Sequence, residues 1–330
     1  MKKVLITGGA GFIGLGLADQ LIKRGYSVHL IDNFSRAVHD RDLESILKCE
    51  NVTFSNIDLL SSDSFLLKDN DFDIIFHLAA IIGVSHVMKR PYDVMVDNIK
   101  MLTSMIDFAR LQKNLSRFLF SSTSEVYAGT LSNFKMEIPT PEFTPLTISD
   151  LGHPRTSYML SKIYGEGLCH NAKIPFTLFR PHNIYGPRMG LSHVIPQQLE
   201  KAYKLEDGED IDVFSPEHTR CFCFIDDAIE MLIRMAESDQ CKGKTLNLGN
   251  QDPEINMLDL AKICHRTVGK DLNVILKSSS PGSPVRRQPN MDLTKKLIDF
   301  ESKIGLPEGI SRTFEWYKKN IFDGNSLSAR

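Results

Sequence analysis

Short apolar runs alternate with longer amphipathic stretches over the first 180 residues of this chain. Most of the apolar runs lack a strict polar/apolar alternation, which is typical of strands covered on both faces in a parallel sheet. We expect strands at 3–7, 27–32, 51–56, 73–78, 117–122 and 176–180. Apolar positions recur with helical spacing at 14–25, 92–112 and 157–172. This alternation predicts an α/β fold, with right-handed βαβ units in a doubly wound parallel sheet.

Residues 181–330 break this rhythm, because proline and glycine are spread between shorter helical and strand-like segments. We expect a main domain over residues 1–180 and a smaller C-terminal α/β lobe over residues 181–330. Some segments of the lobe are expected to return to the sheet. The boundary near residue 180 is therefore soft, and no linker marks it.

The composition narrows the class of protein. With 330 residues, 42% of them hydrophobic, the chain is long enough for a sizeable core. A net charge of −2 without a basic stripe argues against a nucleic-acid partner. The six cysteines lack metal-ligand spacing, so we expect no metal site. Cys221 and Cys223 alternate with phenylalanines and are expected on a buried strand face.

Membrane-spanning and signal segments are recognised in a sequence by the length of their apolar runs. No apolar run approaches the ~20 residues of a membrane span. Only a handful of apolar residues precede the first glycines, which is too few for a signal peptide. We therefore expect a cytoplasmic protein without a membrane partner.

A glycine-rich segment, 7-TGGAGFIG-14, follows the first expected strand. Gly8, Gly11 and Gly14 are spaced three apart, which allows a tight turn and a close approach of the backbone to a pyrophosphate. The helix expected at 14–25 follows directly, and its N-terminus offers N–H groups and a positive dipole end to the phosphates. Alone the motif is weak, because any glycine-rich turn can match it.

Asp32, followed by Asn33, strengthens this interpretation. It closes the second expected strand, where a carboxylate accepts hydrogen bonds from an adenosine ribose. A 2′-phosphate would face this negative charge, so NAD is favoured over NADP, although Arg36 lies close enough to weaken that preference. The segment therefore predicts a dinucleotide site in a Rossmann-type sheet.

Tyr158 and Lys162, in 157-SYMLSK-162, are four residues apart in an expected helix and so project from one face. A tyrosine must shed about three pK units to act as a base near neutral pH, which costs about 4 kcal/mol. An ammonium ~5 Å away supplies about 3 kcal/mol at an effective dielectric constant of about 20. With the charge of an oxidised nicotinamide, the pair forms an acid/base device for oxidising a carbinol. By itself the spacing proves little, because it arises by chance in about every second such chain.

Several motifs occur together along the chain: TGGAGFIG, 31-IDN-33, 77-HLAA-80, 121-SSTSEVYAG-129, the Tyr158/Lys162 pair and 180-RPHNIYGPR-188. Their order resembles that of the extended short-chain dehydrogenase/reductases, and more narrowly of the NAD-dependent nucleotide-sugar epimerase/dehydratase family, which includes UDP-glucuronate decarboxylase-like members. The resemblance covers nearly the whole chain. It implies an NAD-binding Rossmann domain over residues 1–180 and a nucleotide-sugar-binding lobe over residues 181–330.

The resemblance also implies roles for the polar run after the strand expected at 117–122. Thr123 would lie beside Tyr158 and hydrogen-bond the sugar oxygen that is oxidised, and Glu125 would reach the far side of the sugar. Plain 4-epimerases usually carry a small or uncharged residue there, whereas dehydratases and uronate decarboxylases show Thr-Ser-Glu. The Thr123-Ser124-Glu125 run therefore favours elimination or decarboxylation of a 4-keto intermediate.

The family pattern implies binding residues as well. Those expected at the cofactor are Gly8, Gly11, Phe12, Ile13, Gly14, Asp32, Asn33, Asp58, Leu59, Leu78, Ala79, Ala80, Asn98, Tyr158 and Lys162. Those expected at the substrate are Asn183, Arg188, Arg220 and Arg287, with Arg286 open as the alternative to Arg287. Asn98 would brace the active-site backbone, Arg220 would clamp the diphosphate or sugar, and His77 is expected to be packed.

The resemblance implies an NAD-dependent nucleotide-sugar epimerase/dehydratase that works through transient C4 oxidation. A UDP-glucuronate-type decarboxylase is the close alternative, since 150-DLGHPRTSYMLSK-162 is similar to such enzymes. A 4-dehydrogenase that releases its keto product and, remotely, a non-catalytic dinucleotide sensor also stay open. We expect a homodimer through the helices at 92–112 and 157–172. A long insertion at 129–155 departs from the family pattern and could reshape the sugar pocket.

Overall fold

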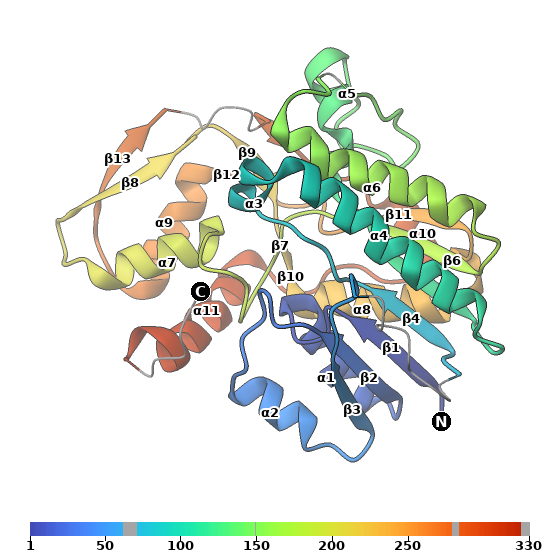
Figure 1. Cartoon of the computed structure of the whole chain (residues 1–330). Coiled ribbons are helices and arrows are strands. Elements are labelled where there is room, and N and C mark those ends of the chain that lie inside the picture. Colours follow the sequence, from blue (N-terminus) through green and yellow to red (C-terminus); the bar gives the residue numbers. More distant parts are fainter. Residues whose placement is uncertain (62–70, 149, 279–283, 325–330) are drawn as a thin grey trace.

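The computed structural model describes residues 1–61, 71–148, 150–278 and 284–324. Within these residues lies a sheet of seven parallel strands in the order β11-β6-β5-β4-β1-β2-β3 (Figure 1). The strands are β1 (Lys3–Thr7), β2 (Ser27–Asp32), β3 (Val52–Asn56), β4 (Ile74–His77), β5 (Arg117–Ser121), β6 (Phe176–Pro181) and β11 (Lys244–Leu248). The predicted Rossmann-type doubly wound sheet is confirmed. Its strand order reverses between β1 and β4, which is where such sheets bind ligands.

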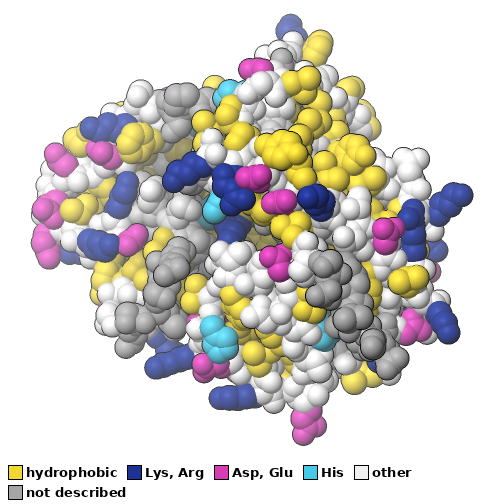
Figure 2. Space-filling model, viewed as in Figure 1, with side chains coloured by type: hydrophobic (Ala, Val, Ile, Leu, Met, Phe, Trp, Pro, Cys, Tyr) yellow, Lys and Arg dark blue, Asp and Glu magenta, His cyan; other side chains and the backbone are white. Residues whose placement is uncertain are grey.

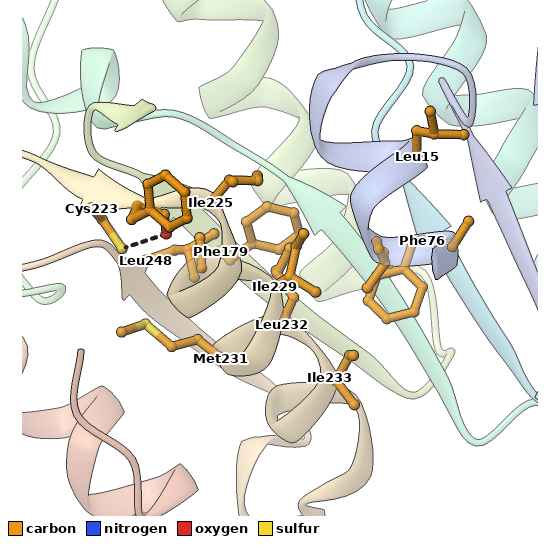
Figure 3. Packing of buried hydrophobic residues seen from close by; sticks show 14 of the residues in the cluster. Leu15, Phe76, Phe179, Cys223, Ile225, Ile229, Met231, Leu232, Ile233 and Leu248 are labelled. Carbon is orange, nitrogen blue, oxygen red and sulfur yellow. Dashed lines mark hydrogen bonds between the residues drawn. The ribbon is translucent and has the colours of Figure 1, made fainter. Parts of the chain in front are cut away.

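Helices cover both faces of this sheet (Figure 1). On one face, α4 (Pro91–Arg110) packs beside α6 (Pro154–Asn171), and on the other α1 (Phe12–Lys23) packs beside α8 (Ile225–Glu237). Figure 3 shows the second layer, where Phe76 and Phe179 of the sheet meet Ile229 and Leu232 of α8. Because both faces are covered, the strands carry continuous apolar runs rather than alternating ones.

The chain after β6 passes between the sheet and a smaller lobe. β11 pairs with β6 at the edge of the main sheet, and α8 packs on α1. The lobe contains α7 (Val194–Lys204), α9 (Met257–Val268), α11 (Leu306–Tyr317) and a parallel pair of strands, β8 (Asp210–Phe214) and β13 (Asn273–Lys277). It lies beyond the carboxyl end of the main strands (Figure 1).

Shorter elements complete the described chain. The helical ones are α2 (Arg41–Leu47), α3 (Val84–Lys89), η1 (Ser124–Tyr127), α5 (Ala128–Asn133), η2 (Asp239–Cys241), α10 (Asp292–Ile298) and η3 (Lys318–Phe322). The short strands are β7 (Ile184–Tyr185), β9 (Thr219–Cys221), β10 (Cys223–Phe224), β12 (Glu254–Asn256) and β14 (Arg286–Arg287). Among these, β12, β9 and β14 form a three-stranded sheet that lies next to the site.

Local sequence explains several of the helix ends. A proline opens both α4 and α6, where a missing N–H costs nothing. Asn256 caps α9 by accepting from the Asp259 N–H at 2.7 Å, and Gly269 ends that helix with φ +82°. Cys221 and Cys223 are buried on adjacent short strands, as predicted. Among the described residues no helix is both long and apolar enough to cross a membrane.

Candidate active site

The glycine-rich turn between β1 and α1 is closely packed. Gly8 has φ +70°, and a Cβ there would lie 3.0 Å from the backbone nitrogen of Ala79. A Cβ at Gly14 would lie 2.3 Å from the carbonyl oxygen of Gly8. Gly11 donates its N–H to the same carbonyl at 3.1 Å. Side chains at these positions would force the backbone apart, so the glycines preserve a turn that exposes bare backbone to a ligand.

Two features beside this turn suit a dinucleotide. α1 begins at Phe12 without a side-chain cap, so its first N–H groups are available to phosphate oxygens. At the end of β2, the Asp32 carboxylate accepts from the N–H groups of Ala10 at 3.1 Å and Phe34 at 2.9 Å. Burial raises the pKa of Asp32, and these N–H bonds lower it. The carboxylate is thereby held beside the turn, where a ribose hydroxyl can donate to it.

The backbone beyond β4 forms the facing wall. His77 is buried and its Nδ1 hydrogen-bonds the Thr7 hydroxyl at 2.8 Å, so it is packed as expected. Asn98 of α4 accepts from the Ile81 N–H at 2.7 Å and donates to the Ile81 carbonyl at 3.1 Å. Asn98 thus braces this backbone in the way the family pattern implied. The turns after β2, β3 and β4 carry the other predicted cofactor residues, Asn33, Asp58, Leu59, Leu78, Ala79 and Ala80.

Tyr158 and Lys162 lie one turn apart on α6, against the end of β5. The Lys162 Nζ donates to the Ser121 carbonyl at 2.8 Å and lies 5.7 Å from the centre of the Tyr158 ring. The Thr123 hydroxyl lies close enough to the Tyr158 phenol to lower the pKa of that phenol. The structure therefore brings together the three groups that were predicted to act on one sugar hydroxyl.

Burial dominates the protonation of this pair. It raises the pKa of the Tyr158 phenol well above the ordinary value, and Glu125 raises it further, while Thr123 and Arg36 lower it. Burial also lowers the pKa of Lys162 to about 7. Burial therefore opposes the charged form of both groups. Ionisation of Tyr158 with the help of Lys162 and an oxidised nicotinamide stays a prediction.

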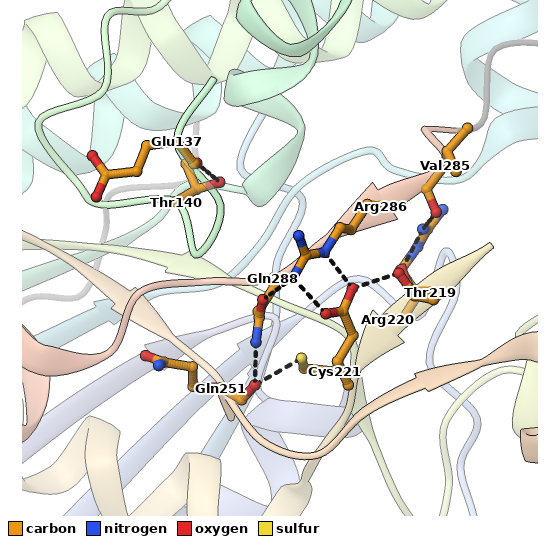
Figure 4. Close-up of polar contacts among 10 residues, drawn as sticks. Glu137, Thr140, Thr219, Arg220, Cys221, Gln251, Val285, Arg286 and Gln288 are labelled. Atoms are coloured by element: carbon orange, nitrogen blue, oxygen red, sulfur yellow. Dashed lines mark hydrogen bonds and ion pairs between the residues drawn. The ribbon is translucent and has the colours of Figure 1, made fainter. Parts of the chain in front are cut away.

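The polar run after β5 meets an arginine from the lobe. The Arg287 guanidinium lies 3.3 Å from the Ser124 hydroxyl and 3.3 Å from a carboxylate oxygen of Glu125. Its neighbour Arg286 forms a two-pronged bond with Glu254, at 2.7 Å for each prong (Figure 4). Successive side chains of a strand point to opposite faces, so only one of the two arginines can face the site. The structure assigns that position to Arg287.

Arg220 on β9 lies opposite Arg287 in register. One of its guanidinium nitrogens donates to the Pro284 carbonyl at 2.7 Å. Burial and then the charge of Arg287 lower the pKa of Arg220 to about 10. Figure 2 shows Lys and Arg side chains near the middle of the viewed face, with Asp and Glu side chains beside them. Asn183, between β6 and β7, donates its side-chain amide to the Cys221 carbonyl at the end of β9, at 2.9 Å. Two guanidinium groups this close favour an anionic ligand.

Arg188 lies beside the glycine-rich turn, and its role in substrate binding stays a prediction. Its Nε donates to Asp40 at 2.6 Å, and its other nitrogens donate to the carbonyls of Ala10 and Val38, each at 3.3 Å. These contacts tie the glycine-rich turn to the loop before α2. The guanidinium is therefore used on the cofactor side of the site, and the structure does not bring it to Thr123 or Arg287. The motif 180-RPHNIYGPR-188 contains this arginine, but the sequence does not indicate which loop its side chain contacts.

A buried ion pair that was not predicted from the sequence lies behind the predicted catalytic residues. Glu166 binds Arg180 of β6 with two contacts of 2.8 and 2.6 Å, and it also accepts from the Ser122 hydroxyl at 2.5 Å. This pair holds the end of β5 that leads to the Thr123 hydroxyl. Glu166 lies four residues after Lys162 and on the same helix face, and that spacing is the signal that could have found it.

Comparisons with known proteins agree with this geometry. Residues 4–249 match the NAD dependent epimerase/dehydratase family. The UDP-N-acetyl-alpha-D-glucosaminuronate decarboxylase of Bacillus cytotoxicus is 29% identical to this chain, over 96% of this chain and 98% of its own length. UDP-glucuronic acid decarboxylase 2 of Arabidopsis thaliana is also 29% identical, over 99% of this chain and 72% of its own length.

A solved structure connects the fold to its cofactor. The UDP-glucuronic acid 4-epimerase of Bacillus cereus, in complex with UDP-glucuronic acid and NAD, superposes with a TM-score of 0.80 at 26% identity, over 96% of this chain and 99% of that one. The glycine turn, the uncapped start of α1 and Asp32 fit this dinucleotide. The chain therefore belongs to the NAD dependent epimerase/dehydratase family and is an NAD-dependent enzyme of that type.

Proposed function

We propose that this enzyme is an NAD-dependent decarboxylase of UDP-hexuronates that works through transient oxidation at C4 of the sugar. The observation that carries the proposal is the contact of Arg287 with Ser124 and Glu125, next to Tyr158 and Thr123. It sets a guanidinium, the preferred partner of a carboxylate, at the edge of the catalytic group. The uronate decarboxylases among the relatives support this choice.

The first step oxidises the sugar at C4. Bound NAD supplies a reversible hydride acceptor at this carbon. Tyr158 takes the proton of the C4 hydroxyl, and Thr123 hydrogen-bonds the same oxygen. Lys162, anchored on the Ser121 carbonyl at 2.8 Å, stabilises the phenolate that this step requires. The Tyr158 phenol would hold the proton while the bound cofactor would take the hydride with two electrons, which would leave a ketone at C4.

The second step removes the carboxylate. A ketone at C4 is β to the carboxylate on C5, so the C5–C6 bond can break with its electron pair moving into the C4 carbonyl. Carbon dioxide leaves and an enolate remains, whose oxygen accepts a hydrogen bond from Tyr158. Glu125, held by Arg287 at 3.3 Å, is placed to pass a solvent proton to C5. Tyr158 would then return its proton to the C4 oxygen, and the hydride held by the cofactor would return to C4, which would give a UDP-pentose.

A turnover assay read by mass spectrometry tests this proposal. Purified protein with NAD is given UDP-glucuronate, UDP-N-acetylglucosaminuronate and the matching neutral UDP-hexoses. We expect a UDP-uronate to give a product lighter by one carbon dioxide, without net NADH. Loss of water would instead establish a dehydratase, and loss of two hydrogens with accumulating NADH would establish a 4-dehydrogenase. NAD binding without any turnover would point to the sensor.

A uronate 4-epimerase is the second candidate. It is favoured by the solved 4-epimerase with UDP-glucuronic acid and NAD, which superposes on 96% of this chain. An epimerase has to retain the carboxylate of its keto intermediate and let the sugar ring turn over in the site. The charged pair of Glu125 and Arg287 favours a ring held in one orientation, which suits decarboxylation better. A product of unchanged mass in the same assay would decide for the epimerase.

We also propose a homodimer formed through α4 and α6. Part of the apolar pattern on α4 packs on the sheet, namely Leu102, Met105, Ile106 and Ala109. Met95 and Ile99 are only half-buried, and Tyr92 and Tyr164 of the same two helices are exposed. A second copy would cover this apolar strip. Light scattering that shows a stable monomer at micromolar concentration would contradict the dimer.

We further propose that the enzyme acts in the cytoplasm. Fractionation of cells that produce the tagged protein tests it, and recovery with the membrane fraction would contradict it.

A further inference from the structure

The insertion that follows the catalytic strand is tied down close to Arg287. It folds back over α5, where the Thr130 hydroxyl donates to the Pro145 carbonyl. A Cβ on Gly129 would lie 1.8 Å from the carbonyl oxygen of Thr147, so the two segments touch through their backbones. The innermost part of the insertion carries Thr140 and Glu142, and both side chains are buried.

This inner part pairs with the segment that carries Arg287. The Thr140 N–H donates to the Gln288 carbonyl at 2.8 Å, and the Asn290 N–H donates to the Thr140 carbonyl at 2.9 Å. On the opposite side β14 pairs with β9, so that Arg287 faces Arg220. Figure 4 shows Gln288 between the end of Arg286 and the Gln251 backbone, while Thr140 approaches from the insertion. The short strand of Arg287 is thus supported from two sides.

One buried carboxylate anchors the insertion side of this support. The Glu142 Oε1 accepts from the Asn247 N–H of β11 at 2.9 Å and from the Thr294 hydroxyl at 3.4 Å. Asn247 in turn donates its side-chain amide to the carbonyls of Thr140 and Asn290, at 3.0 Å each. The backbone carbonyl of Glu142 accepts from Arg180 of β6 at 2.9 Å. The main sheet, the insertion and the segment at 288–290 therefore converge on Glu142.

From these contacts we infer that Glu142 is a positioning residue for Arg287 and, through it, sets the preference of the enzyme for a sugar that carries a carboxylate. The inference rests on the proposed function. Glu142 is 9% exposed and its Oε1 is bound by the Asn247 N–H and the Thr294 hydroxyl, so we place it behind the site and not at the substrate. Both contacts of Arg287, to Ser124 and Glu125, are 3.3 Å, so a shift of a few tenths of an ångström breaks them.

The consequence is selective, because a neutral sugar offers no group to the Arg287 guanidinium. A merely structural residue would weaken the binding of both kinds of sugar, as well as of NAD. A residue that acts through Arg287 weakens the uronate alone. The two roles therefore separate in the ratio of two dissociation constants.

The experiment measures binding in the Tyr158→Phe background, where the sugar stays unoxidised. Calorimetry of the NAD-loaded protein gives the Kd of UDP-glucuronate and of UDP-glucose. Glu142→Ala is expected to raise the Kd of the uronate about tenfold and that of the hexose less than twofold, and to leave NAD binding unchanged. Glu142→Gln keeps an acceptor for the Asn247 N–H and is expected to retain the preference within threefold. Glu137→Ala, an exposed residue of the same insertion, serves as the control.

A double-mutant cycle completes the test. Adding Glu142→Ala to Arg287→Met should raise the uronate Kd no further than Arg287→Met alone. A full additive loss, or an equal loss for both sugars, would overturn the inference. If Glu142→Ala does not fold, the shorter side chain of Glu142→Asp tests the same point. This variant is expected to raise the Kd of the uronate about threefold. The Tyr158→Phe protein without any change at Glu142 is measured first. If it binds UDP-glucose more tightly than UDP-glucuronate, the proposed function is wrong, and the inference about Glu142 is wrong with it.

Discussion

Replacing Arg287 with methionine removes the guanidinium that we assign to the substrate carboxylate, while keeping an apolar stem of similar length. The Arg287 side chain is 16% exposed and contacts Ser124 and Glu125. A hydrogen bond to a charged group contributes about 1.5–3 kcal/mol. Because the site is only partly shielded from water, we expect a loss of about 10- to 150-fold in kcat/KM for a UDP-uronate.

Arg286 provides the matched control on the same strand. It is 47% exposed and pairs with Glu254 on the opposite face. An exposed ion pair contributes about 0–1 kcal/mol, so Arg286→Met should change kcat/KM by less than about fivefold. Arg287→Lys keeps the charge without the two-pronged geometry and should fall between the two.

The assay is the initial rate of product formation from a UDP-uronate, with Kd values for a neutral UDP-hexose measured in parallel. The account predicts a large loss for Arg287→Met with the uronate and none for hexose binding. If Arg286→Met lost as much activity as Arg287→Met, or if Arg287→Met kept kcat/KM within threefold, the assignment of Arg287 to the carboxylate would be wrong.

Three further outcomes follow from the site and its surroundings. Tyr158→Phe should lower kcat by about 10²- to 10⁴-fold while NAD titration is unchanged, and a parallel loss of NAD binding would contradict its catalytic role. Gly14→Ala places a Cβ 2.3 Å from the Gly8 carbonyl oxygen and should abolish NAD binding. An unchanged Kd for NAD would show that the glycine-rich turn does not bind the dinucleotide. Burial lowers the pKa of His182 to about 3, against about 6.5 in the unfolded chain. Between these two pKa values the unfolded state therefore binds more protons than the folded state. As the pH is lowered below about 6.5, the free energy of unfolding should decrease by up to about 1.4 kcal/mol per pH unit. His182→Gln should reduce this slope in urea unfolding between pH 7 and pH 5, and an identical slope would show that His182 is not the cause.

The sequence predicted most of the framework because that framework depends on local patterns. Each expected strand of the main domain appears within about one residue of its predicted bounds, since runs covered on both faces are apolar throughout. The Tyr158/Lys162 pair and the glycine turn depend on fixed spacings within single elements. Their relation to Thr123 follows from the parallel order of β5 and β6, which places strand ends at one edge.

Long-range polar contacts were harder to predict. Whether Arg286 or Arg287 faces the site depends on the register of β14 against β9. β14 is too short to show an alternating pattern in the sequence. Arg188 lies in a family motif, yet its partner Asp40 comes from a distant loop. The energy balance of Tyr158 also needed the structure, because burial acts on both the phenol and Lys162 and no spacing reports burial.

Domain boundaries show the same limit. The sequence separates residues 1–180 from 181–330 by rhythm alone. β11 and α8 belong to the later part of the chain, yet they complete the main sheet and its second helical layer. A sequence pattern identifies such elements as a strand and a helix but does not state which sheet they join.

The most direct test of the central claim follows the carboxylate carbon itself. UDP-glucuronate labelled with ¹³C at C6 is mixed with the enzyme and substoichiometric NAD, and the reaction is followed by ¹³C NMR together with absorbance of NADH. The account predicts that the label leaves the sugar as carbon dioxide and bicarbonate over many turnovers per NAD, while NADH does not accumulate. A label that stays in the carboxylate of a sugar isomer, or a stoichiometric rise of NADH, would contradict it.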